Sequence, residues 1–113
     1  MANYEIINQK PIHTSRVFDE ISTRTQNREM TYREERTLEY LKKFNKLSAK
    51  QFEEAYSELV SLEIPRIEEF QLIKILEIMP KNGPELRAII SHGGVVVVDE
   101  TVTQILDVLK KFQ

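Results

Sequence analysis

Two helix-start signals in the first half of the chain constrain its fold more than any other feature. Thr31 and Glu34 form a capping box, in which a hydroxyl and a carboxylate each bond a free backbone amide at the start of a helix, and Ser48 and Gln51 form a second one. Each box is followed by apolar residues at helical spacing, and the link between the two stripes is one or two residues long. We therefore expect two helices joined as a hairpin or by a sharp bend. The apolar positions are Leu38, Leu41, Phe44 and Leu47 for the first helix, and Phe52, Ala55, Tyr56, Leu59 and Val60 for the second.

The segment before these helices, residues 3–12, carries no helix signal. Tyr4, Ile6 and Ile7 favour extended structure and Pro11 stops it, so we expect a short strand. No second strand lies nearby in the sequence, and a lone strand leaves its backbone groups unpaired unless another sheet takes them up. A first helix should follow, capped by Thr14 or Ser15. Its apolar side is formed by Val17, Phe18 and Ile21.

The second half of the chain predicts three more helices. One should begin at Pro65 and end at Pro80, the next should start at Gly83-Pro84, and Asp99 or Thr101 should cap the last. The expected fold is therefore mostly α: a short N-terminal strand and helices, then a helical bundle. We place the division between an N-terminal region, residues 1–62, and a C-terminal lobe, residues 63–113. The apolar positions of the three helices are Ile67, Phe70, Ile73 and Leu76, then Leu86, Ile89 and Ile90, then Val102, Ile105, Leu106, Leu109 and Phe112.

Composition excludes several classes of protein. With 41% apolar and 30% charged residues, the chain should fold rather than remain disordered. The longest apolar run, Val95 to Val98, is far too short to cross a membrane, so we expect no membrane partner. There is no cysteine, which excludes disulfides and cysteine–zinc sites and suits a cytoplasmic protein.

No arrangement of residues predicts catalysis. His13 and His92 lie far apart and in no metal-ligand spacing, so each is expected to be a surface or capping residue. The three glycines make no phosphate-binding loop, and no serine lies in a nucleophile context. We therefore expect no catalytic residue, no metal and no cofactor, and a function exerted by binding another macromolecule.

Charge distribution keeps a second hypothesis open. Residues 31–50 hold six basic and three acidic side chains, whereas residues 51–77 hold two basic and seven acidic ones. Lysines near a helix end match the helix dipole, which favours a solvated terminus over a track for phosphates. The alternative is a stand-alone nucleic-acid-binding module on the C-terminal lobe. Its candidate contacts are Lys74, Lys81, Arg87, Lys110 and Lys111.

The N-terminal third cannot bury its apolar residues by itself. A lone strand, a weak helix and one strong amphipathic helix are too few for a core. They must either fold back on the C-terminal helices or dock on another protein, and addition to a partner's sheet would satisfy residues 3–7 directly. Tyr4 and Tyr32 lie outside the clearest apolar stripes and are candidates for contacts with a partner.

Several blocks, in order, resemble one family. Residues 38–47 (LEYLKKFNKL), residues 48–64, residues 72–80 (LIKILEIMP), residues 85–90 (ELRAII) and the final helix resemble the F-type subunit of archaeal RNA polymerase. That subunit is the counterpart of the fourth subunit of eukaryotic RNA polymerase II. The resemblance covers roughly residues 3 to 113. Each block is a weak signal alone, and their order, spacing and total length make the resemblance specific.

The resemblance implies a non-catalytic stalk subunit that forms a heterodimer with the polymerase's E-type subunit, which is the other stalk protein, on the polymerase core. It also implies a C-terminal lobe like the HRDC domain of helicases. The stalk supports transcription initiation and elongation and contacts transcription factors and the nascent RNA. The resemblance assigns the contact with the E-type subunit, by position, to Tyr4, Ile6, Ile7, Val17, Phe18, Ile21, Leu38, Leu41 and Phe44.

Overall fold

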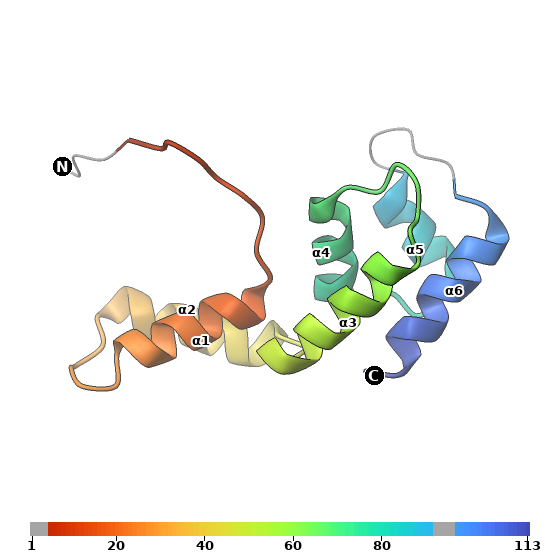
Figure 1. Cartoon of the computed structure of the whole chain (residues 1–113). Coiled ribbons are helices and arrows are strands. Elements are labelled where there is room, and N and C mark those ends of the chain that lie inside the picture. Colours follow the sequence, from red (N-terminus) through yellow and green to blue (C-terminus); the bar gives the residue numbers. More distant parts are fainter. Residues whose placement is uncertain (1–4, 92–96) are drawn as a thin grey trace.

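The computed structural model describes residues 5–91 and 97–113, and all regular secondary structure in these two ranges is α-helical. The expectation of a mostly helical fold is therefore confirmed. The helices, shown in Figure 1, are α1 (Thr14–Arg24), α2 (Tyr32–Phe44), α3 (Ala49–Ser61), α4 (Glu69–Ile78), α5 (Gly83–Ile90) and α6 (Asp99–Lys110).

The expected N-terminal strand is not shown. Residues 5–12, called the arm from here on, have no regular secondary structure, and Tyr4 lies outside the described residues. A strand requires backbone hydrogen bonds to a neighbouring strand, and the described part of this chain offers none. In Figure 1 the arm is an open trace that leads from the N-terminal side to the start of α1, and its last residues line a pocket together with α3 and α4.

Both capping boxes are confirmed. The Thr31 hydroxyl accepts from the Glu34 amide at 3.2 Å, and the Glu34 carboxylate accepts from the Thr31 amide at 2.9 Å. Ser48 and Gln51 make the same reciprocal pair at 3.2 and 3.1 Å. Because each box satisfies two otherwise free amides, α2 and α3 begin where the local sequence predicts.

Two other helix starts use a different cap from the one expected. The N-cap of α1 is His13 rather than Thr14 or Ser15, because the imidazole accepts the free amide of Ser15 at 3.1 Å. The N-cap of α6 is Val98 rather than Asp99 or Thr101, and the Asp99 carboxylate instead forms an ion pair with Arg87 of α5.

The fourth helix begins later than Pro65. Residues 65 and 66 form a turn, and both Glu63 and Arg66 adopt a left-handed backbone, with φ of 51° and 65°. The helix starts after Glu68, whose amide donates to the Gln71 side chain at 2.9 Å. At the other end, Met79 is left-handed with φ of 53° and Pro80 follows, which confirms that α4 ends at this proline.

Helices α3 to α6, together called the bundle, share one apolar core. Its members run from Leu47 in the α2–α3 link to Leu109 in α6, so the core crosses the expected division after residue 62. That division remains a prediction. The buried apolar residues include Phe52, Ala55 and Leu59 of α3, Leu72, Ile73, Ile75 and Leu76 of α4, Leu86, Ile89 and Ile90 of α5, and Val102, Ile105, Val108 and Leu109 of α6.

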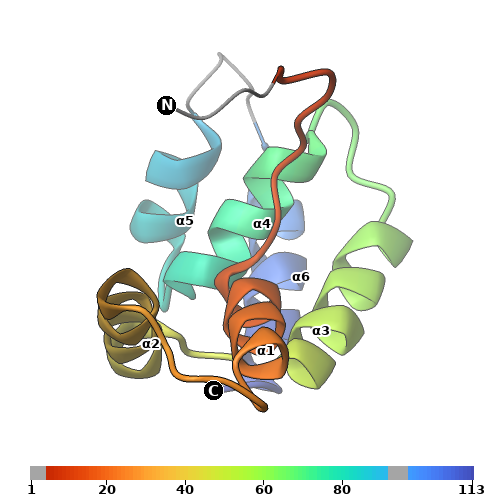
Figure 2. The ribbon, with the colours of Figure 1, turned by 90° about the vertical axis from the view of Figure 1, so that its left-hand side faces the viewer.

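Helices α1 and α2 form a hairpin that projects from this bundle. Figure 2 shows α1 between α2 and α3, and α1 packs against both. Of the two arrangements expected for α2 and α3, a hairpin or a sharp bend, the structure has the sharp bend, with α1 packed between the two helices. The radius of gyration of the Cα atoms is 16.4 Å, against about 13 Å for a compact domain of this length. The principal extents of 49 × 32 × 22 Å describe an elongated molecule.

Candidate partner-binding surface

The arm presents its apolar side chains to solvent. Ile6 is 70% exposed and Ile7 92% exposed, and Ile12 at the arm's end is also exposed. Exposed isoleucines next to each other on an unpaired backbone are costly in water, and a partner sheet would cover both features at once. The structure therefore leaves the predicted arm residues Ile6 and Ile7 free to make an intermolecular contact.

The hairpin distributes its predicted contact residues unequally. Val17, Phe18 and Ile21 of α1 are half-buried, so each keeps part of its side chain accessible. Leu38 and Leu41 of α2 are buried within the chain. Apart from Ser15, they are the only buried residues of the two helices. The hairpin thus has a thin interior and much apolar surface left over, which indicates that its stability depends on neighbours.

Helix α2 carries an outward row of aromatic and basic residues that we name the α2 outer stripe: Tyr32, Arg36, Tyr40, Lys43 and Phe44. The exposed fractions are 72% for Tyr32, 58% for Tyr40 and 55% for Phe44. The Tyr40 and Phe44 rings lie 4.7 Å apart. The Arg36 guanidinium lies 5.9 Å from the Tyr32 ring centre and the Lys43 ammonium 5.8 Å from that of Phe44. Exposed aromatic and arginine side chains are typical of protein-binding surfaces.

The sequence predicted Phe44 as a contact with the E-type subunit and Tyr32 as a candidate partner contact, but Tyr40 was not among the predicted residues. The signal was available, because Tyr32, Arg36, Tyr40 and Phe44 recur every four residues and therefore lie along one side of a helix.

The candidate nucleic-acid contacts do not form one free patch. Arg87 donates to the Val97 carbonyl at 2.6 Å and pairs with Asp99, and Lys111 pairs with Glu58 of α3 at 3.0 Å. The other three are exposed and lie on separate elements, Lys74 on α4, Lys81 after α4 and Lys110 at the end of α6. Their contact with nucleic acid remains a prediction.

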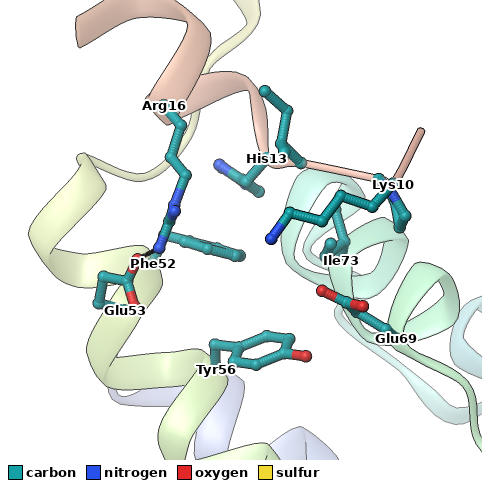
Figure 3. A pocket seen from close by; sticks show the side chains of 10 residues that line it. Lys10, His13, Arg16, Phe52, Glu53, Tyr56, Glu69 and Ile73 are labelled. Carbon is teal, nitrogen blue, oxygen red and sulfur yellow. Dashed lines mark ion pairs between the residues drawn. The ribbon is translucent and has the colours of Figure 1, made fainter. Parts of the chain in front are cut away.

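A pocket of about 110 Å³ lies where the arm and the hairpin meet the bundle. Figure 3 shows Arg16 reaching from α1 to Glu53 of α3, with which it forms an ion pair, while Phe52 lies beside it. Lys10 of the arm and Glu69 of α4 extend toward the centre of the pocket.

His13 lies in the wall of this pocket and is only 1% exposed. Its ring stacks on Phe52 with 4.4 Å between ring centres. Burial lowers the pKa of His13 from its ordinary value, although the hydrogen bond to the Leu76 carbonyl and the charge of Glu77 raise it in part. Burial likewise raises the pKa of the nearby Tyr56 hydroxyl, and the charge of Glu69 adds to that effect.

The described residues contain neither a membrane span nor a metal-binding group of side chains. No helix in them is long and apolar enough to cross a membrane. Within the same residues, no three histidine, cysteine, aspartate or glutamate side chains are grouped so that they could hold a metal ion.

Comparison with known proteins supports the family resemblance that the sequence predicted, and it does so over nearly the whole chain. The family model described as RNA polymerase Rpb4 matches residues 3–113. A curated relative, the DNA-directed RNA polymerase subunit Rpo4 of Methanocaldococcus jannaschii, is 29% identical over 112 residues. The alignment covers 99% of this chain and 92% of that protein. Because the family model spans all of the helices described above, the chain belongs to the RNA polymerase Rpb4 family.

Proposed function

We propose that this chain is a non-catalytic accessory subunit of an archaeal DNA-directed RNA polymerase. In this proposal it works in the cytoplasm as half of the polymerase stalk, in a heterodimer with the E-type subunit. The stalk supports transcription initiation and elongation through contacts with factors and the transcript. Family membership over residues 3–113 supports the polymerase role. The observation that carries the heterodimer is the apolar arm and hairpin that the chain leaves uncovered.

The arm is the first element of the proposed interface. Residues 5–12 have no regular structure, yet they hold two adjacent and highly exposed isoleucines. A sheet on the E-type subunit would pair the backbone of this segment and cover Ile6 and Ile7 on its two faces. The interface would continue onto the half-buried side of α1, formed by Val17, Phe18 and Ile21.

The α2 outer stripe extends the proposed interface beyond the residues assigned from sequence. Leu38 and Leu41 are already used inside the hairpin, so they would support the interface from behind. Tyr32, Tyr40 and Phe44 are exposed and would make the contacts. Aromatic and arginine side chains commonly carry most of the energy of an interface.

Residues 63–113, which supply α4 to α6 of the bundle, form the HRDC-like lobe in this proposal. Independent nucleic-acid binding by that lobe is the weaker alternative, because Arg87 and Lys111 are neutralised by Asp99 and Glu58 within the chain. Strong binding to phosphates needs several basic groups free at one surface.

A matched pair of double variants tests the arm. Ile6→Asp with Ile7→Asp and the control Asn8→Asp with Gln9→Glu each add two negative charges to neighbouring positions of the same segment. Only the first pair removes apolar side chains. Burying one isoleucine contributes about 1.5–3 kcal/mol, so loss of two should weaken binding to the E-type subunit at least ~100-fold. The control should change the affinity by less than ~10-fold. Titration calorimetry on the full chains measures both.

Equal losses in the two double variants would mean that charge, not apolar contact, is responsible, and the arm would lose its assigned role. Submicromolar RNA binding by the isolated chain, weakening steeply with salt, would instead favour the nucleic-acid module.

A further inference from the structure

The hairpin is joined to the bundle by polar contacts that converge on the last turn of α4. The Leu76 carbonyl accepts from the His13 ring at 3.3 Å, and the Ile78 carbonyl accepts from the Lys46 ammonium at 2.7 Å. The Glu77 carboxylate accepts from the Thr14 amide at 2.9 Å. The last turn of α4 contains no basic residue of its own. Two of its carbonyls, those of Leu76 and Ile78, therefore accept from side chains that lie before α3 in the sequence.

His13 makes this connection through both ring nitrogens. Nδ1 accepts from the Ser15 amide at 3.1 Å and lies 2.8 Å from the Ser15 hydroxyl. Because a backbone amide can only donate, Nδ1 carries no proton, and the proton of the neutral ring is on Nε2. Nε2–H then donates to the Leu76 carbonyl. One ring thus connects the N-terminus of α1 to the C-terminal turn of α4.

A second proton on this ring would remove the cap of the Ser15 amide. Nδ1–H could donate to the Ser15 hydroxyl, which lies 2.8 Å away, but it would also face the Ser15 amide, so two donors would oppose each other at the positive end of the α1 dipole. The ring is 1% exposed and stacked on Phe52, so the charge could reach water only if the first turn of α1 moved away from α3 and α4. A buried, unhydrated charge is costly enough to drive such a movement.

The surrounding charges oppose one another. On α4, Glu77 attracts a proton to His13, and Glu69 lines the same pocket as His13. On α3, Glu53 is paired with Arg16 of α1, and Tyr56 is uncharged near neutral pH. Lys10 of the arm and Lys46 after α2 add positive charge on the other sides. Burial outweighs the attraction of Glu77, since the net effect is a lowered His13 pKa.

We propose that His13 is an acid-sensitive latch: its neutral ring holds the α1–α2 hairpin against the bundle, and protonation of the ring releases the hairpin. The latch belongs to this chain alone and stands whether or not the chain binds the E-type subunit.

The test uses the full chain carrying His92→Gln, which leaves His13 as the only histidine. Nitrogen-15 NMR of the imidazole reports the tautomer and the titration. The chain contains no cysteine, so spin labels on Arg33→Cys in α2 and Gln104→Cys in α6 report the hairpin–bundle distance. We expect the Nε2–H tautomer at neutral pH and a titration midpoint below about 6.5. In the same pH range the distance distribution should broaden, and the exchange protection of the Ser15 amide should fall by about fivefold, as for loss of an N-cap.

Two further variants and one control variant show whether the charge on His13 causes the change. His13→Gln cannot be charged, so the acid-induced distance change should vanish in it. Glu77→Gln keeps an oxygen for the Thr14 amide but removes the negative charge, so the release should move to more acidic pH. The control Glu53→Gln breaks the Arg16 ion pair and should leave the midpoint nearly unchanged.

Three results would each overturn the latch. One is an Nδ1–H tautomer at neutral pH. A second is titration of His13 without any change in the distance. The third is an acid-induced distance change that persists in His13→Gln.

Discussion

Replacing one leucine in the bundle and one in the hairpin compares how much each part contributes to the free energy of unfolding. Leu76 of α4 is completely buried in the shared core, and Leu41 of α2 is 4% exposed in the thin interior of the hairpin. Leu76→Ala should lower the free energy of unfolding by about 4 kcal/mol, near the upper end of the range for buried leucines, because tightly packed neighbours surround the cavity. That is a large part of the roughly 5–15 kcal/mol that holds a domain together.

Leu41→Ala should cost less, about 2 kcal/mol, at the lower end of the same range, because the hairpin has few buried neighbours and can close around the gap. Urea unfolding followed by circular dichroism gives both values, and amide exchange shows which helices each change destabilises. Leu41→Ala should accelerate exchange in α1 and α2 but leave α4 to α6 protected. Leu76→Met is the control, since it keeps the volume and should cost less than about 1.5 kcal/mol.

Equal costs for the two alanine variants, with the same loss of protection in all six helices, would refute this reasoning. The hairpin and the bundle would then form one cooperative unit, and the hairpin would not depend on a partner.

Three further predictions concern single sites. Thr31→Ala should destabilise the chain by about 1 kcal/mol through loss of the α2 N-cap, measured by thermal unfolding against Thr37→Ala, which lies on the same helix. Arg28 and the Thr31 amide lower the pKa of Glu34 to about 2. The stability that this carboxylate contributes should therefore be complete above about pH 4.5 and be lost as the pH falls toward about 2. Unfolding measured over a series of pH values should show this loss in the unchanged chain and should lack it in Glu34→Gln. Gly83→Ala should change the stability by less than about 1 kcal/mol, because the entropy that alanine removes from the unfolded chain is opposed by contact of the new Cβ with Pro84, the next residue in the helix. Among the described residues beyond its chain neighbours, the new Cβ meets Val102 at 3.7 Å; a larger shift, seen by thermal unfolding, would contradict this.

Features determined within a few residues of one another could be predicted from the sequence. The capping boxes at Thr31 and Ser48 and the stop at Pro80 depend on local hydrogen bonding and backbone geometry, and the structure contains all three. The apolar positions Leu86, Ile89 and Ile90 of α5 are also buried as expected.

Features that depend on distant residues could not be predicted. His13 caps α1 while its other nitrogen bonds Leu76, 63 residues away, so its buried position needs the tertiary fold. The turn before α4 uses left-handed Glu63 and Arg66, residue types that give no turn signal comparable to glycine. The strand expected for the arm requires a second sheet, which this chain does not contain in its described residues.

The candidate site was predicted only in part. Ile6 and Ile7 are exposed as an interface requires, whereas Leu38 and Leu41 are buried inside the hairpin. Periodicity identifies the apolar face of α2 but not what covers it. In this structure α1 packs against α2, and the aromatic residues of the outer stripe remain exposed.

Hydrogen exchange on the chain with and without the E-type subunit tests the central claim most directly, with light scattering used to confirm a 1:1 complex. The account predicts that residues 5–12 exchange freely in the lone chain and become protected in the complex, together with α1 and α2, while the bundle changes little. A lone chain in which residues 5–12 are already protected, or a complex that leaves them exchanging freely, would contradict it.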